Sequence, residues 1–212
     1  MQLESSRLWR PLFVIGGILY VGGGSQHPRG EMVEMLADPV WFRAHIIVAV
    51  GLLVVTAGLV MFRRTQQPTS SLRQWLLFAV AATALETVEM VIHAMAYVDA
   101  EALALGRSTP VLITHAWLAT LVYPVFAAAV IGIILAGQRE RSVGSPLFGW
   151  LGIFGAAVHG IVMVPVFIFE IGPATVLFPV AVISLALWFI LAGIWPMRAK
   201  EGSLAIEISE AV

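Results

Sequence analysis

Histidines are the residues best suited to chemistry in this chain, which has five of them and no cysteine. His45, His93 and His115 each lie a few residues inside one end of a long apolar segment. At a rise of about 1.5 Å per residue, helices would bring the three imidazoles to a similar depth. Neutral imidazole is a ligand of zinc, copper and iron, including the iron of haem. The sequence therefore predicts a layer of cofactor-binding histidines.

Carboxylates accompany this layer. Four polar residues are spaced by three, four and four positions, which is the spacing of one helical face: Glu86, Glu89, His93 and Tyr97. We expect this face to point into the interior, with Glu86 and Glu89 as groups that carry protons. His159, on a later segment, is predicted to lie at the depth of Glu86 and is a further candidate metal ligand.

Two more polar residues, His27 and Glu170, lie near the ends of apolar segments and are secondary candidates. Any one of these residues, taken alone, also fits a structural role. A single His or Glu within an apolar helix can serve as a hydrogen-bonding contact between helices, worth about 0.6 kcal/mol on average. The clustering of several such residues favours a functional site.

The segments that carry these residues have the composition of membrane-spanning helices. The chain is 59% hydrophobic and 12% charged, whereas about 25% of residues are charged in a soluble domain. About six apolar segments approach the ~20 residues needed for one helical crossing: 8–24, 41–62, 74–98, 110–136, 147–169 and 174–195. The predicted fold class is all-α, a polytopic integral membrane protein with a bundle of about six transmembrane helices.

Basic residues indicate the orientation of this bundle. They gather in alternate connections and after the last segment: Arg63, Arg64, Arg73, Arg139, Arg141, Arg198 and Lys200. The other connections hold only Arg29, Arg43 and Arg107. By the positive-inside rule, both termini are predicted to be cytoplasmic, in a multi-pass protein of the plasma membrane. Residues 1–200 would form one transmembrane domain, and 201–212 a short cytoplasmic tail.

The remaining connections carry acidic residues followed by a proline that opens the next segment, and we expect short helices there. This arrangement occurs twice, between His27 and His45 and again between His93 and His115. It indicates a weak repeat of two-helix hairpins, although chance similarity between two membrane hairpins is another explanation.

Glycines are concentrated in two of the predicted segments. They are Gly16, Gly17, Gly22, Gly23 and Gly24 in the first, and Gly149, Gly152, Gly155 and Gly160 in the fifth. Small residues allow two helices to pack closely, and they would equally allow a flat macrocycle to lie against a helix. Close packing is the commoner use.

Several functions are excluded by composition and missing motifs. The net charge of −1 provides no basic surface for nucleic acid. Lys200 is the only lysine and lies outside the apolar segments, which excludes a retinal Schiff base. The chain has no P-loop, no dinucleotide-binding glycine motif and no metalloprotease or haem-attachment motif.

The first hypothesis is therefore a membrane-embedded redox protein resembling a b-type cytochrome. Two of His45, His93 and His115 would ligate haem b, and Glu86 or Glu89 would carry protons coupled to electron transfer. The redox partner would be a quinol or another redox protein.

Two alternatives remain open. In a non-haem enzyme, the histidines would bind Zn, Cu or Fe and act on a lipid or another apolar substrate, with Glu89 as base. In a proton-coupled transporter, His and Glu would line a path, although six spans are few for a carrier unless it forms a homo-oligomer. A scaffold or accessory subunit of a larger complex is a further possibility, which the short tails neither support nor contradict.

Overall fold

The computed structural model describes residues 7–65, 68–143, 145–169 and 171–195, which fold into helices and turns. The long helices are α2 (Trp9–Ser25), α4 (Val40–Thr65), α5 (Ser70–Met95), α7 (Pro110–Arg139), α8 (Pro146–Met163) and α9 (Leu177–Ile194). The shorter elements are α3 (Met32–Ala37), α6 (Ala100–Ala104), the 3₁₀ turns η1 (Ala96–Asp99) and η3 (Gly172–Val176), and the π turn η2 (Val164–Ile168). The predicted all-α class is confirmed for these residues, whereas the predicted tail at 201–212 lies outside them.

Five helical segments are long and apolar enough to cross a membrane: Val40–Thr65, Ser70–Ala104, Pro110–Arg139, Pro146–Ile168 and Gly172–Ile194. The predicted segment 8–24 appears as α2, which has 17 residues. At ~1.5 Å per residue this helix extends about 26 Å, less than the ~30 Å of a bilayer core. Length and composition therefore support five of the six predicted spans.

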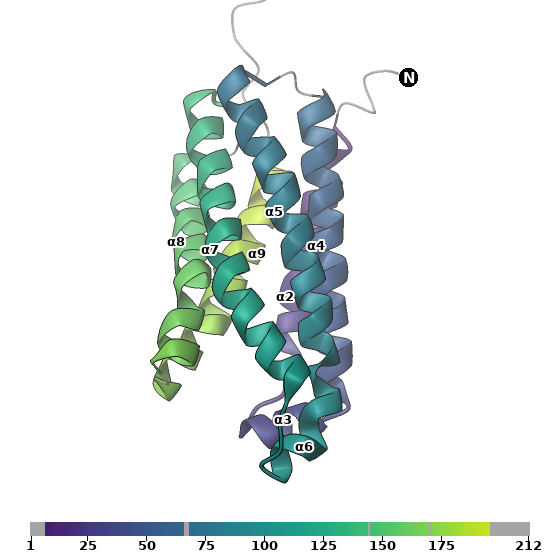
Figure 1. The fold of residues 1–212 in the computed structure, drawn as a ribbon. Helices are drawn as coiled ribbons and strands as arrows, with labels where there is room; N and C mark the ends of the chain where they lie inside the picture. Colours follow the sequence, from purple (N-terminus) through teal and green to yellow (C-terminus); the bar gives the residue numbers. More distant parts are fainter. Residues whose placement is uncertain (1–6, 66–67, 144, 170, 196–212) are drawn as a thin grey trace, which may run out of the picture.

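The long helices form a closed ring. Each of them packs against the next long helix along the chain, from α2 through α4, α5, α7 and α8 to α9, and α9 packs back against α2 (Figure 1). This closure brings the two ends of the described chain together, because α2 lies between α4 and α9. Residues distant in sequence can therefore meet inside the ring.

Short helices occupy both acidic connections, as expected. α3 packs against α6 at the end of the bundle opposite the N-terminus (Figure 1). The acidic side chains bind the starts of the next long helices: Asp38 accepts a hydrogen bond from the Val40 amide at 2.7 Å, and Asp99 from the Leu112 amide at 2.9 Å. Amides in a first helical turn lack partners within their helix, so these carboxylates stabilise α4 and α7.

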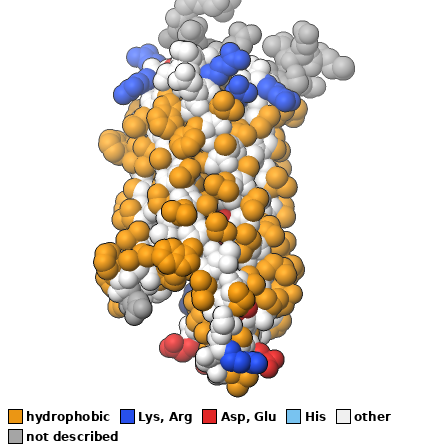
Figure 2. All heavy atoms as spheres, viewed as in Figure 1, with side chains coloured by type: hydrophobic (Ala, Val, Ile, Leu, Met, Phe, Trp, Pro, Cys, Tyr) orange, Lys and Arg blue, Asp and Glu red, His pale blue; other side chains and the backbone are white. Residues whose placement is uncertain are grey.

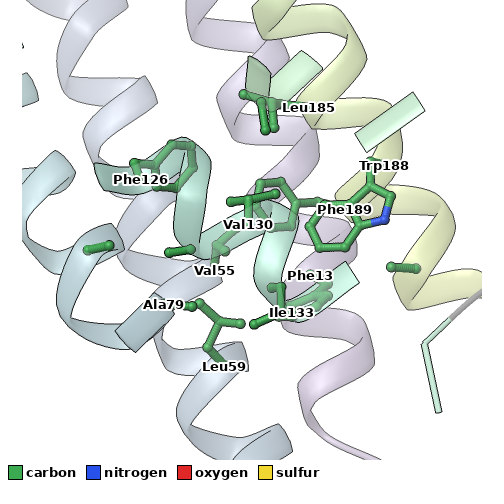
Figure 3. Close-up of a cluster of buried hydrophobic side chains, with 14 of the residues drawn as sticks. Phe13, Val55, Leu59, Ala79, Phe126, Val130, Ile133, Leu185, Trp188 and Phe189 are labelled. Atoms are coloured by element: carbon green, nitrogen blue, oxygen red, sulfur yellow. The ribbon is translucent and has the colours of Figure 1, made fainter. Parts of the chain in front are cut away.

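The surface and the interior are both largely apolar. Figure 2 shows hydrophobic side chains over the sides of the molecule, basic residues gathered at one end, and both acidic and basic residues at the other. Inside the ring, the half nearer the basic end is filled by packed apolar side chains (Figure 3): Phe13, Val55, Leu59, Ala79, Phe126, Val130, Ile133, Leu185, Trp188 and Phe189. The buried polar residues lie in the other half.

Candidate functional site

Three histidines from three helices meet inside the ring. The ring centroids of His45 on α4 and His93 on α5 are 4.1 Å apart. His93 in turn stacks on His115 of α7, with centroids 3.6 Å apart and ring planes 13° from parallel. The predicted convergence of these histidines is confirmed, whereas their role as ligands stays a prediction.

Glu89 completes a group of possible metal ligands. It lies one turn before His93 on α5, and its Oε1 is hydrogen-bonded to His115 Nδ1. One ligand atom from each of Glu89, His93 and His115 lies within 4.8 Å of the others. Two imidazoles and a carboxylate are a ligand set used for zinc and for non-haem iron, so the donor types fit such an ion.

The hydrogen bonds of the imidazoles determine which nitrogen is available. His45 Nδ1 donates to the Trp41 carbonyl oxygen at 2.7 Å, one helical turn earlier. The corresponding nitrogen of His115 is held by Glu89. A histidine whose Nδ1 is held by a carbonyl or carboxylate presents Nε2 to a metal in a fixed orientation. Both His45 and His115 therefore have the orientation expected of ligands.

Several buried polar atoms in this region have no hydrogen-bond partner. They are His93 Nδ1, Glu89 Oε2, Glu86 Oε2 and His159 Nδ1. A buried polar atom without a partner costs free energy, of the order of 1–3 kcal/mol. Such atoms occur where a bound ion, water or substrate supplies the missing contact. Their presence on the predicted residues supports a ligand-binding role for the cluster.

Glu86 and His159 form a second pair, deeper in the ring. His159 Nε2 lies 2.8 Å from Glu86 Oε1, and both side chains are buried. The Tyr123 ring stacks on His159 with centroids 4.1 Å apart. The predicted similarity of depth is confirmed. The group of possible ligand atoms is formed by Glu89, His93 and His115, and the role of His159 as a metal ligand stays a prediction.

Tyr97 was expected on the same inward face as Glu89 and His93, and this prediction is wrong. Its side chain is 42% exposed and packs on Phe42, with ring centroids 5.6 Å apart. α5 ends at Met95, and the chain continues as a 3₁₀ turn. This turn has 3.0 residues per turn instead of 3.6, so it rotates Tyr97 away from the face that the helical spacing predicted.

The two secondary candidates differ in outcome. His27 follows α2 and lies half-buried beside the clustered histidines, with its ring centroid 4.9 Å from that of His45. Burial lowers the pKa of the His27 imidazole, and its hydrogen bond to the Pro28 carbonyl partly opposes this shift. Glu170 lies outside the described residues.

Trp41 belongs to the site although the sequence reasoning missed it. Its indole is buried against His27, His45 and His93, with ring centroids 5.1, 4.4 and 5.1 Å away. Its Nε1 donates to the His93 carbonyl oxygen at 3.1 Å and so ties α4 to α5. The four-residue spacing from Trp41 to His45, which puts both on one helical face, was the available signal. Tyr123 on α7 was missed as well, and it had no comparable signal.

Four of the five glycines of α2 are used for helix packing: Gly16, Gly17, Gly23 and Gly24. A Cβ on Gly16 would lie 2.6 Å from Val55, and one on Gly23 would lie 2.6 Å from the Ala44 carbonyl oxygen. α2 is therefore pressed against α4 at these positions. At these positions the space that could have accommodated a macrocycle is already occupied by protein.

Comparisons with known proteins add no family to this description. No protein-family model, curated protein or solved structure matches this chain. The functional conclusion therefore depends on the site itself.

Proposed function

We propose that the protein is an integral membrane protein of the plasma membrane, with six spans and both termini on the cytoplasmic side. Five long apolar helices and an apolar lateral surface support this placement. α2 is shorter, but it completes the ring between α4 and α9 and so shares their environment. The arginines at the two ends give the orientation, since one end carries more of them than the other.

We propose further that Glu89, His93 and His115 bind a transition-metal ion, with His45 beside them as an additional ligand. The observation that carries this proposal is the approach of their ligand atoms to within 4.8 Å inside the ring. The unpartnered atoms of Glu89 and His93 supply further support. Imidazole with carboxylate suits Zn, Cu or Fe.

The function that this site supports best is that of a metal-dependent membrane enzyme acting on a lipid or another apolar substrate. The bound ion would supply Lewis acidity or redox chemistry. Glu89 also orients His115 through its hydrogen bond to His115 Nδ1. Trp41 on α4 holds α5 in place beside it, because its ring contacts both His45 on α4 and His93 on α5.

A b-type haem protein that exchanges electrons with a quinol or a redox protein is the second candidate. One observation favours it: His45 and His115, on different helices, both have Nδ1 engaged and Nε2 available, as axial haem ligands do. A macrocycle between them would require His93 to leave its position 3.6 Å from His115. The possible ligand atoms of Glu89, His93 and His115 already lie within 4.8 Å of one another, and we therefore prefer the bare ion.

The test is elemental analysis of the protein purified in mild detergent, with optical spectra of the oxidised and the dithionite-reduced sample. We expect a stoichiometric amount of Zn, Cu or Fe and no Soret band. We expect the metal to be lost in each of three variants: His93→Ala, His115→Ala and Glu89→Gln. Tyr97→Phe changes an exposed side chain outside the cluster, and this variant should retain the metal. A Soret band would favour the haem protein. A colourless, metal-free protein would leave a proton-coupled transporter or an accessory subunit.

A further inference from the structure

Seven arginines of the described residues gather at the end of the bundle where α2 begins (Figure 2). They lie at or beside the starts of α2 and α5 and the ends of α4 and α7: Arg7, Arg10, Arg63, Arg64, Arg73, Arg139 and Arg141. The carboxylate that the described residues add to this end, Glu140, accepts hydrogen bonds from the amide and the hydroxyl of Thr69. This end therefore carries a large excess of positive charge.

The arginines of this end are not neutralised by neighbouring carboxylates. Among the described residues, the ion pair between an arginine and a carboxylate lies at the opposite end, where Arg107 is 3.1 Å from Glu101. The positive-inside rule accounts for the presence of arginines at one end of a bundle. It does not account for how their N–H groups are satisfied.

Three buried N–H groups at this end have no hydrogen-bond partner. They are Trp9 Nε1, Arg10 Nε and Arg63 Nε, and the Trp9 side chain is only 1% exposed. The other buried side-chain atoms without a partner in the described residues belong to the glutamates and histidines of the candidate site. At the basic end, by contrast, every such atom is a donor. A buried donor without an acceptor is destabilising, so this end is suited to a ligand that supplies acceptor atoms.

Packing of α2 against its two neighbours brings these donors near one another. The Trp9 ring lies against Phe62 of α4, with centroids 4.6 Å apart, and Arg63 is the next residue of α4. The Arg10 guanidinium carbon lies 5.7 Å from the centroid of the Trp9 ring. Arg10 also donates to the Trp195 carbonyl oxygen, which directly follows α9. This hydrogen bond holds the guanidinium at the junction of α2 and α9.

We propose that Trp9, Arg10 and Arg63 bind the headgroup of an anionic phospholipid in the membrane leaflet at this end. The phosphodiester of such a lipid is negatively charged and offers only accepting oxygens, and guanidinium groups bind phosphate through charge-assisted hydrogen bonds. The ester carbonyls of the lipid are further acceptors, and indole N–H groups are enriched at this depth of a membrane. The apolar side of the bundle, shown in Figure 2, provides the surface that acyl chains require.

The test compares phosphatidylglycerol with phosphatidylcholine, whose choline neutralises the phosphate charge. Binding of each lipid to the full chain, delipidated in mild detergent, is measured by native mass spectrometry. We expect phosphatidylglycerol to bind about tenfold more tightly, the effect of about one charge-assisted hydrogen bond. Equal binding of the two lipids would overturn the proposal. Displacement of phosphatidylglycerol by an equal concentration of inorganic phosphate would identify a soluble anion as the ligand and would overturn it as well.

Variants locate the binding site. Arg10→Gln and Arg63→Gln should each weaken phosphatidylglycerol binding about tenfold, because each removes a charge-assisted hydrogen bond. Trp9→Phe keeps a packed ring and removes the N–H group, and it should weaken binding about fivefold. Arg64→Gln is the matched control, since it removes the same charge from the same end through an exposed side chain, and it should bind the lipid as the unmodified protein does. Equal losses in Arg63→Gln and Arg64→Gln would indicate a diffuse effect of charge and refute the site.

This inference rests on the proposed membrane placement and is independent of the metal site, which lies in the other half of the ring. Metal content, measured on the same samples, should therefore be equal in all four variants. Loss of both metal and lipid in the two half-buried arginine variants would indicate a general folding defect. Trp9→Phe would then decide, because unchanged phosphatidylglycerol binding in that variant would refute the site. Cysteine labelling in whole cells tests the membrane placement separately.

Discussion

Glu86 and His159 show why single residues in this interior are strongly interdependent. Glu86 is fully buried, and His159 is only 3% exposed. Each therefore depends on the other to compensate for lost contact with water. Removing one partner of such a buried pair leaves a polar or charged group unsatisfied, which costs about 3–5 kcal/mol, whereas replacing both partners costs much less.

This dependence predicts the outcome of a double-mutant cycle. Glu86→Leu and His159→Leu should each lower the free energy of unfolding by about 3 kcal/mol, and the double variant should lose less than the sum. Glu86→Gln, which keeps a hydrogen-bonding group, is the matched conservative change and should cost less than Glu86→Leu. Unfolding in mixed detergent micelles measures these differences. Additive losses would show that the contact contributes nothing specific.

At the scale of elements, the position of α2 depends on a few close contacts. Gly16 and Gly23 face α4, and a Cβ on Gly17 would lie 2.8 Å from the Ala186 carbonyl oxygen on α9. Backbone atoms cannot move aside as flexible side chains can. α2 is therefore held in the ring by shape as much as by hydrophobicity. Because His27 directly follows α2, this packing also keeps His27 beside His45.

Adjacent glycines provide a matched test of this packing. A Cβ on Gly23 would meet the Ala44 carbonyl oxygen at 2.6 Å, whereas one on Gly22 would meet nothing within 4 Å. Gly23→Ala should destabilise the protein by about 1–3 kcal/mol, because a closely packed interface must open. Gly22→Ala should be neutral or should stabilise it by up to about 1 kcal/mol, through its better helix propensity. Thermal unfolding in detergent compares them, and equal effects would contradict the close contact.

At the scale of the whole molecule, charge and polarity are distributed unequally between the two ends. The apolar core lies toward the arginine-rich end, and the histidine and glutamate groups lie toward α3 and α6. A ring with this asymmetry can interact differently with the two sides of a membrane. The orientation of the chain therefore decides which compartment the site serves.

The absence of native cysteine makes this orientation measurable in whole cells. Glu101→Cys on α6 and Ser71→Cys at the start of α5 are exposed positions at opposite ends. We expect an impermeant maleimide to label the first from outside the cell and the second only after permeabilisation. The reverse pattern would invert the proposed topology. Labelling of both from outside would contradict a spanning bundle.

The sequence by itself determined the helical class, the approximate bounds of the long helices and the depth of the main polar residues. Composition and helical periodicity are sufficient for these, because each depends on one segment at a time. His45, His93 and His115 could therefore be predicted to converge, and Glu86 could be matched in depth with His159.

Only the tertiary structure decided which of these groups are partners. Periodicity gives the face of a helix, but the neighbour of that face depends on the order and rotation of the helices around the ring. The pairing of His115 with Glu89, the contact of Trp41 with the histidines and the closure of α9 on α2 all follow from packing between helices. Tyr97 was misplaced for a related reason, since a change of helix type after Met95 altered its direction.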